Sequence, residues 1–206
     1  MNQKTSVFQK TYTDYIYKVF EMDFAAIEEK LGVQVKDQDI MIPLLDQVYC
    51  VSKKGIFDAS GKKPALDICV ILCRYLLLCP EQTPEDKEWV SFKDFKDSNP
   101  LINYFSNDVE RKIARAFSKK TESLKSACVK LNGRPSDLQL SYDVSFTFNL
   151  LPKMPLLMLF NDADDDFEAN CTVLFERRAE VYLDAECLAM LGWQLFSNLK
   201  KGLKEL

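Results

Sequence analysis

Hydrophobic and polar residues alternate most regularly in residues 142–150, YDVSFTFNL. This two-residue period is typical of a strand with one buried and one solvated face. The residues of the apolar side are Tyr142, Val144, Phe146, Phe148 and Leu150. Apolar runs at 154–160 and 171–177 follow and predict a two-stranded hairpin around an acidic loop. Shorter alternating runs within 33–57 predict a further group of antiparallel strands joined by tight turns.

Apolar positions at three- and four-residue spacing predict helices before, between and after these strands. The predicted helices cover residues 5–20, 23–31 with Asp23 as cap, 65–79 with Pro64 at its start, 98–105, and one helix from Asn107 to a stop at Asn132-Gly133. A terminal helix, capped by Asp184, carries a stripe of leucines. Gly192 lies inside it at a cost of about 1 kcal/mol relative to alanine, and a close contact with a sheet would explain that glycine.

Strands and helices are segregated along the chain, and no βαβ alternation with a glycine-rich turn is present. This order predicts an α+β fold with antiparallel sheets and helices packed on one face. The chain has 206 residues and 47% apolar content, enough for one compact domain over residues 1–206. Residues 80–98 have no clear period beyond a strand-like piece at 88–92, and a subdivision of the domain would fall there.

The net charge and the N-terminal residues indicate which partners and which compartment to expect. The net charge is −4, and the lysine and arginine doublets lie in separate segments with acids nearby, so we expect solvated faces and no nucleic-acid partner. The N-terminal residues have no continuous apolar stretch of the signal-peptide kind, which predicts a cytoplasmic protein. The most apolar windows are shorter than a membrane helix needs, so no membrane partner is expected.

Seven cysteines, an odd number without a CxxC pair, predict free thiols in a reducing compartment. Cys69, Cys73 and Cys79 come nearest to a metal-ligand spacing. Their predicted helix is apolar nearly all round, and such burial raises a thiol pKa, whereas a metal needs the thiolate. We therefore interpret the cysteines as buried apolar residues and predict neither a metal site nor a cofactor.

The chain contains no histidine, which excludes Ser-His-Asp and Cys-His nucleophilic systems and histidine-ligated zinc. Glycine-rich nucleotide motifs are absent as well. No catalytic residue is predicted, and an enzyme that uses only carboxylates and lysine is left as an open alternative.

The acidic stretch 161–168 is either a turn or a cation site. A calcium loop started at Asp162 would place Phe167 where a glycine is required and Val173 where a bidentate glutamate belongs. Aspartates also form turns by binding their own backbone, and charges at a hairpin tip discourage edge pairing. The turn is the favoured interpretation and a weak cation site is the alternative.

Short motifs in the second half of the chain resemble one family. They are Asp143, the LP pair at 151–152, Lys153, PLLMLF at 155–160, Asp166-Phe167, VLFE at 173–176 and YLDAE at 182–186. Together with the earlier segment VYCVSKKGIFDASGKKPALDICVILCRYLL, this run is similar to the bacterial and archaeal family called domain of unknown function 3786, which is common in anaerobes. The resemblance covers most of the chain and departs at Glu176, where the family more often has aspartate.

Asp143, Lys153 and Asp166 fall where the resemblance is strongest, and each lies beside an apolar strand. We predict that they converge at the rim of a sheet as a polar ligand-binding site, in which a buried lysine-carboxylate group would have shifted pKa values. The alternative is that Asp143 faces solvent and that the other two are loop charges.

The leading functional hypothesis is a non-catalytic cytosolic binding or accessory domain with a protein or small-molecule partner. Aromatic residues suited to interfaces support it: Tyr12, Tyr15, Tyr17, Trp89 and Tyr104. The family has no assigned reaction, and some relatives resemble fusions to cysteine-rich iron-sulfur segments of the kind found in corrinoid proteins. The alternative is therefore a small metal-, iron-sulfur- or corrinoid-associated redox protein of anaerobic metabolism, although this chain has no such segment.

Overall fold

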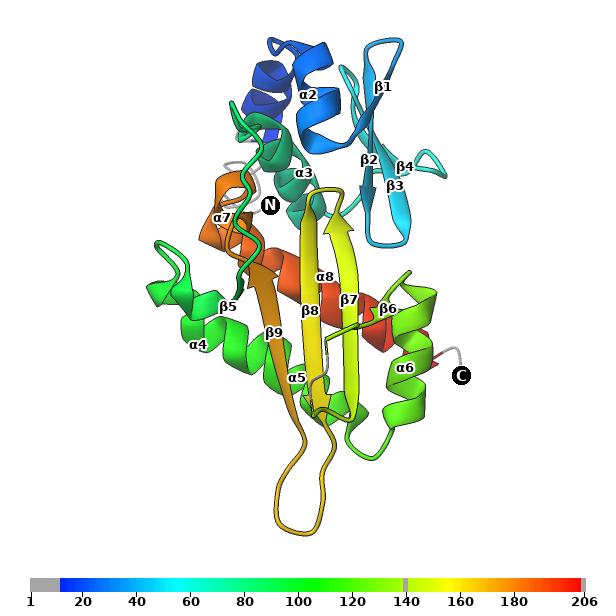
Figure 1. Cartoon of the computed structure of the whole chain (residues 1–206). Coiled ribbons are helices and arrows are strands. Elements are labelled where there is room, and N and C mark those ends of the chain that lie inside the picture. The colour runs from blue at the N-terminus through cyan, green and yellow to red at the C-terminus, as the bar shows by residue number, and fades with distance from the viewer. Residues whose placement is uncertain (1–11, 139–140, 205–206) are drawn as a thin grey trace.

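The computed structural model describes residues 12–138 and 141–204 and contains two antiparallel sheets. The four-stranded sheet lies beyond one end of the five-stranded sheet, at the top of Figure 1. The four-stranded sheet has the order β1 (Gln34–Lys36), β2 (Asp39–Leu44), β3 (Gln47–Ser52) and β4 (Gly55–Asp58). The five-stranded sheet has the order β5 (Trp89–Ser91), β9 (Asn170–Glu176), β8 (Met154–Asn161), β7 (Val144–Leu151) and β6 (Arg134–Pro135). The α+β fold class predicted from the sequence is therefore confirmed.

The α-helices of the described part pack around these sheets. Residues 12–19 are helical, and the helices that follow are α2 (Phe24–Leu31), α3 (Leu66–Leu77), α4 (Ile102–Phe105), α5 (Arg111–Phe117), α6 (Thr121–Lys130), α7 (Ala179–Tyr182) and α8 (Ala185–Lys204). Within residues 12–138 and 141–204, none of the helices combines the length and the apolar composition of a membrane span. The first predicted helix, 5–20, is borne out over 12–19, whereas its residues 5–11 lie outside the described part.

Caps and turns that the sequence predicts form as expected at several helix ends. The Asp23 carboxylate accepts a hydrogen bond from the Ala25 N–H at 3.1 Å and begins α2, and Gly32 ends that helix with a left-handed φ of 66°. The Asp184 carboxylate accepts from the Cys187 N–H at 2.9 Å at the start of α8. The predicted position of Pro64 at the start of a helix is wrong. Helix α3 begins at Leu66, so this proline precedes the helix instead of occupying its first position.

The register of the five-stranded sheet follows the alternation in its sequence. β7 pairs with β8 through partners such as Val144 with Phe160 and Thr147 with Leu157, and β8 pairs with β9, which confirms the predicted hairpin. Val144, Phe146 and other alternate residues of β7 are buried, whereas Asn149 is exposed. The strand-like piece at 88–92 is β5, which pairs with β9 at the edge of the sheet.

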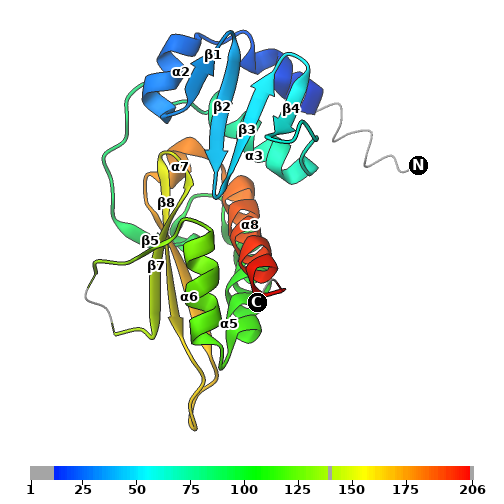
Figure 2. The same ribbon diagram turned by 90° about the vertical axis from the view of Figure 1, so that its right-hand side faces the viewer.

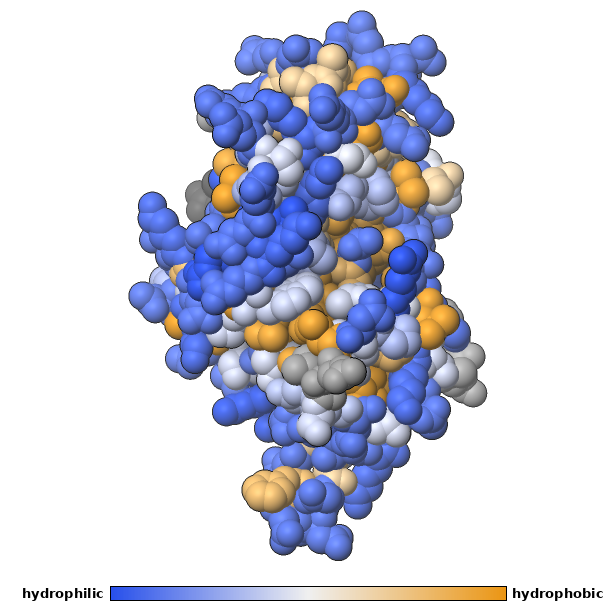
Figure 3. All heavy atoms as spheres, viewed as in Figure 1, coloured by the Kyte–Doolittle hydropathy of each residue, from blue (hydrophilic) through white to orange (hydrophobic). Residues whose placement is uncertain are grey.

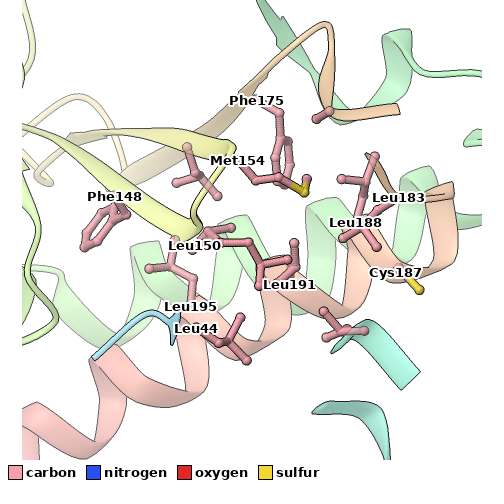
Figure 4. Packing of buried hydrophobic residues seen from close by; sticks show 14 of the residues in the cluster. Leu44, Phe148, Leu150, Met154, Phe175, Leu183, Cys187, Leu188, Leu191 and Leu195 are labelled. Atoms are coloured by element: carbon pink, nitrogen blue, oxygen red, sulfur yellow. The ribbon is translucent and has the colours of Figure 1, made fainter. Parts of the chain in front are cut away.

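Helices α5, α6 and α8 cover one face of the five-stranded sheet (Figure 2). Figure 3 shows the opposite side of the molecule, where hydrophilic residues dominate and apolar ones gather toward the centre. Leucines of α8 pack beneath the strands at the core (Figure 4). The side chains labelled in that view include Leu191 and Leu195 of α8, Phe148 and Leu150 of β7, and Leu44 of the four-stranded sheet. One continuous hydrophobic core therefore connects the two sheets.

The single helix predicted from Asn107 to residue 131 is wrong in two respects. Helical structure already begins at Asn99 and runs through a π-helical segment, Ser106–Glu110, into α5, so Asn107 caps nothing. The chain then leaves the helix at Ser118, and Lys119 takes a left-handed φ of 59° before α6 starts. The Asp162 carboxylate accepts the Lys119 N–H at 2.6 Å and stabilises this break, an interaction between residues 43 positions apart that local periodicity cannot reveal.

Gly192 allows a close helix-to-helix contact, not the helix-to-sheet contact expected from the sequence. A Cβ atom at this position would lie 2.5 Å from the ring of Phe105 in α4. That ring cannot move away easily because it stacks on Phe92, with ring centroids 4.4 Å apart, and lies against Phe175. The glycine thus lets α8 and α4 approach each other.

Candidate functional site

The structure separates the three residues predicted to form a ligand site. Asp143 precedes β7, and its carboxylate accepts the Asp162 N–H at 2.7 Å. Lys153 lies in the β7–β8 turn at the other end of the eight-residue strand, a separation of about 26 Å for an extended chain. Asp166 is exposed in the β8–β9 loop, at the same end as Asp143. The structure thus brings Asp143 to the acidic loop and leaves Lys153 apart, and ligand binding by these residues stays a prediction.

Carboxylates of the acidic loop bind backbone N–H groups. Asp162 accepts from Ala163 at 2.8 Å as well as from Lys119, and Asp164 accepts from Asp166 at 2.9 Å and from Phe167 at 2.7 Å. These are turn-forming interactions. Within the described ranges, no three acidic or cysteine side chains lie where they could hold one metal ion.

The seven thiols are unpaired and are distributed through the molecule. Cys69, Cys73, Cys128, Cys171 and Cys187 are buried, and Cys50 and Cys79 are half-buried. Burial raises the pKa of Cys69 to about 11 and that of Cys73 to about 12, so both stay protonated at neutral pH. These two, on one face of α3, are poor nucleophiles and poor metal ligands in this state.

A cleft of about 530 Å³ lies between the four-stranded sheet and the ends of α6 and α8, two helices that cover the five-stranded sheet. One wall comes from the β2–β3 turn and the end of β4, and the other comes from the last turns of α6 and α8. Residues 64–68, where α3 begins, close it from a third side. We call this hollow the inter-sheet cleft; it is formed by segments from both halves of the chain.

Two buried polar side chains line the inter-sheet cleft. Tyr49 and Gln194 are only 7% and 8% exposed. The Gln194 Nε2 donates to the Asp67 carboxylate at 2.6 Å, and its backbone carbonyl accepts from Asn198 Nδ2 at 2.8 Å. The Tyr49 hydroxyl and the Gln194 Oε1 make no hydrogen bond with any described residue. A donor and an acceptor are therefore left over on the wall of the cleft.

The rim of the inter-sheet cleft carries charges of both signs. Lys130 and Lys201 stand on the helical side, and Lys201 Nζ donates to the Asn198 side chain at 2.9 Å. Asp46 and Asp58 stand on the side of the four-stranded sheet. Hydrogen bonds from the Ser60 side chain and the Lys62 N–H lower the pKa of Asp58, which keeps it ionised. Burial, with the nearby charges of Asp46 and Asp58, raises the pKa of Tyr49, which keeps it a hydrogen-bond donor.

Sequence reasoning did not identify the residues of this cleft. The signal that could have found them is in α8, where Gln194, Asn198 and Gly202 recur every four residues beside the leucine stripe. Residues at this spacing share one face of a helix, so they form a polar and small line next to an apolar one. Tyr49 has no comparable signal. The alternation of β3 predicts that its side chain is buried, but it does not predict which residues surround it.

Comparison with known proteins adds a family but no described function. No curated protein and no solved structure matches the chain. The family model described as "Domain of unknown function (DUF3786)" matches residues 23–198, which include both sheets and nearly the whole inter-sheet cleft. The chain therefore belongs to the DUF3786 family.

Proposed function

We propose that this protein is a non-catalytic binding domain that holds a small polar molecule in the inter-sheet cleft. The observation that carries the proposal is the pair of buried side chains, Tyr49 and Gln194, each with a polar atom that no described residue satisfies. Both atoms are accessible from the cleft, since the fully buried side-chain atoms without a partner among the described residues are Ser145 Oγ and Tyr182 Oη. A molecule in the cleft could therefore reach a donor and an acceptor that lack a protein partner. A bound molecule would supply that partner.

The size and charge of the cleft indicate the class of ligand. A volume of about 530 Å³ falls in the ordinary range of small-molecule sites. Lysines on one rim and aspartates on the other favour a molecule that is neutral and polar or that carries both charges. The apolar part of the lining, which includes Leu44 and Leu131, would contact a short carbon skeleton.

The protonation states in the cleft support binding more than proton transfer. The lowered pKa of Asp58 and the raised pKa of Tyr49 both strengthen the form that each group already has at neutral pH. A general acid or base works best with a pKa near the working pH, and the chain has no histidine to provide one. We therefore propose recognition without a chemical step.

The cysteines bear on two further proposals, the compartment and the redox alternative. Seven unpaired cysteines support a reducing compartment such as the cytoplasm. Their spread through the molecule, with five of them buried, gives less support to a metal-, iron-sulfur- or corrinoid-associated protein. Metal analysis and absorption spectra of anaerobically purified protein distinguish the two: bound iron or cobalt would favour the redox alternative.

The binding proposal is tested with amino acids, nucleosides and sugars as probes. Compounds that raise the melting temperature are titrated by calorimetry against the wild type and against Tyr49→Phe, which removes only the hydroxyl. Loss of one hydrogen bond of about 1 kcal/mol should weaken binding roughly fivefold. Tyr104→Phe is the matched control, because Tyr104 is an exposed tyrosine outside the cleft. Unchanged affinity in both Tyr49→Phe and Gln194→Leu would contradict the proposal.

A further inference from the structure

A second hollow, of about 490 Å³, lies between residues 12–21 and the β3–β4 hairpin. Figure 2 shows the helix of residues 12–19, in dark blue, beside the four-stranded sheet. We call this hollow the N-terminal groove. Its aromatic wall consists of Tyr12, Tyr17 and Phe20, and its basic wall consists of Lys53, Lys54 and Lys63.

The aromatic wall is anchored to the hairpin. The Tyr12 hydroxyl accepts the Ile56 N–H at 3.0 Å, and the approach is close enough that a Cβ on Gly55 would lie 3.1 Å from that oxygen. Phe20 packs edge-on against Phe24, with ring centroids 5.4 Å apart. Tyr17, in contrast, is 71% exposed. A fixed support thus presents an aromatic ring to solvent, as protein interfaces often do.

Within the described part of the chain, the lysines of the basic wall outnumber the acids that line the groove. Lys53 and Lys54 form the tip of the β3–β4 hairpin, Lys63 follows β4, and none of the three makes an ion pair with a described residue. Elsewhere, Lys112 and Lys125 do make ion pairs, at 2.6 and 2.8 Å. Glu21 is the one acid among the described residues that line the groove. Three positive charges are therefore concentrated on a protein whose net charge is −4.

We propose that the N-terminal groove binds an acidic peptide segment of a partner protein, with an aromatic or large apolar side chain against Tyr17 and Phe20. Acidic side chains would neutralise the three lysines, and the apolar anchor would cover the exposed ring. The groove contains three lysines and no arginine. This is a small basic surface, whereas binding the phosphate backbone of a nucleic acid needs an extended one.

The family model covers only part of this surface. The family model begins at residue 23, whereas the aromatic wall comes from residues 12–21. The part matched by the family thus supplies the lysines but not the rings. The proposal is independent of the inter-sheet cleft, since the two hollows share no described lining residue.

The probe is a fluorescein-labelled synthetic peptide of alternating glutamate and phenylalanine, and its anisotropy is measured at low salt. Replacing Lys53 and Lys54 by glutamate should weaken binding about tenfold, because two attractions become repulsions. The matched control replaces Lys93 and Lys96, two exposed lysines near β5, in the same way and should bind like the wild type. Tyr17→Ser should weaken binding severalfold, and Tyr49→Phe in the cleft should leave it unchanged.

Three results would overturn the proposal. One is equal affinity of the wild type and the Lys53→Glu, Lys54→Glu variant. Another is equal binding of a peptide in which serine replaces phenylalanine, because the aromatic wall would then have no role. The last is tighter binding of a short oligothymidylate than of the acidic peptide with the same dependence on Lys53 and Lys54, which would make the groove a nucleic-acid surface.

Discussion

The two ends of the five-stranded sheet carry polar groups in opposite settings. At the end next to the four-stranded sheet, Glu176 and Arg178 form an ion pair whose side chains are only 10% and 14% exposed. The Tyr75 hydroxyl there donates to the Leu31 carbonyl at 2.8 Å and accepts the Lys153 N–H at 3.2 Å. At the far end, most of the acidic loop 161–168 is exposed and its carboxylates bind nearby backbone.

The difference shows that charge density in the sequence is a poor guide to polar groups that matter for the fold. The acidic loop concentrates charge between β8 and β9, and its carboxylates accept backbone N–H groups, within the loop at Asp164 and from Lys119 at Asp162. The buried groups lie outside that stretch. Tyr75 meets Leu31 and Lys153 through the tertiary structure. Glu176 and Arg178 are only two positions apart, and packing removes water from their ion pair. Removing a buried partner costs more because the group left behind loses both water and its hydrogen bond.

The same kind of truncation at the two ends should give the largest contrast in stability. Glu176→Ala leaves Arg178 as an unpaired, largely buried charge and should lower the free energy of unfolding by about 3 kcal/mol. Asp164→Ala removes two local hydrogen bonds in an exposed loop and should cost less than about 1 kcal/mol. Urea unfolding of both variants measures the difference, and equal losses would refute the comparison.

Removing a single hydroxyl group from a tyrosine at each end of the sheet tests the same contrast with a smaller change. Tyr75→Phe leaves the Leu31 carbonyl and the Lys153 N–H without their shared partner and should cost about 1–3 kcal/mol. Tyr142→Phe, at the far end of the sheet, changes an exposed hydroxyl and should leave the melting temperature unchanged. A Tyr75→Phe variant as stable as the wild type would show that water replaces the hydroxyl.

The smallest expected effect is a pH dependence at the edge of β9. β5 pairs with Leu174–Glu176 of β9. At the preceding residue of β9, the Glu110 carboxylate accepts the Val173 N–H at 3.0 Å. Burial raises the pKa of Glu110 above its usual 4.5, so the folded protein holds this proton more tightly than the unfolded chain does. The corresponding stability is present below pH 4.5 and is lost as the pH rises through the folded value.

Glu110→Gln keeps an oxygen acceptor for Val173 but cannot ionise. Its stability should match or exceed that of the wild type at neutral pH, and the difference should shrink as the pH falls below 4.5. Unfolding by urea at a series of pH values checks this. A difference that grows toward low pH would mean that the ionised carboxylate stabilises the fold.

Local patterns predicted the elements well where a single segment decides its own structure. The alternation in 144–150, the caps at Asp23 and Asp184 and the apolar runs of the hairpin all depend on neighbours a few residues apart. Tyr142, expected on the buried face, precedes β7 and is 36% exposed. The helix predicted from Asn107 failed because the Lys119 N–H is bound by Asp162, far along the chain. The candidate ligand site illustrates the same limit, since adjacency to strands does not say at which end of a strand a residue lies.

The sequence by itself determined the α+β class, the family, the absence of histidine chemistry and the pairing of most strands, because these follow from composition, motifs and short-range periodicity. Only the tertiary structure decided which polar groups meet. It brought Tyr49 and Gln194 to one cleft and three scattered lysines to one groove. The physical reason is that burial removes water from a polar group, and which groups lose their water depends on how distant segments pack.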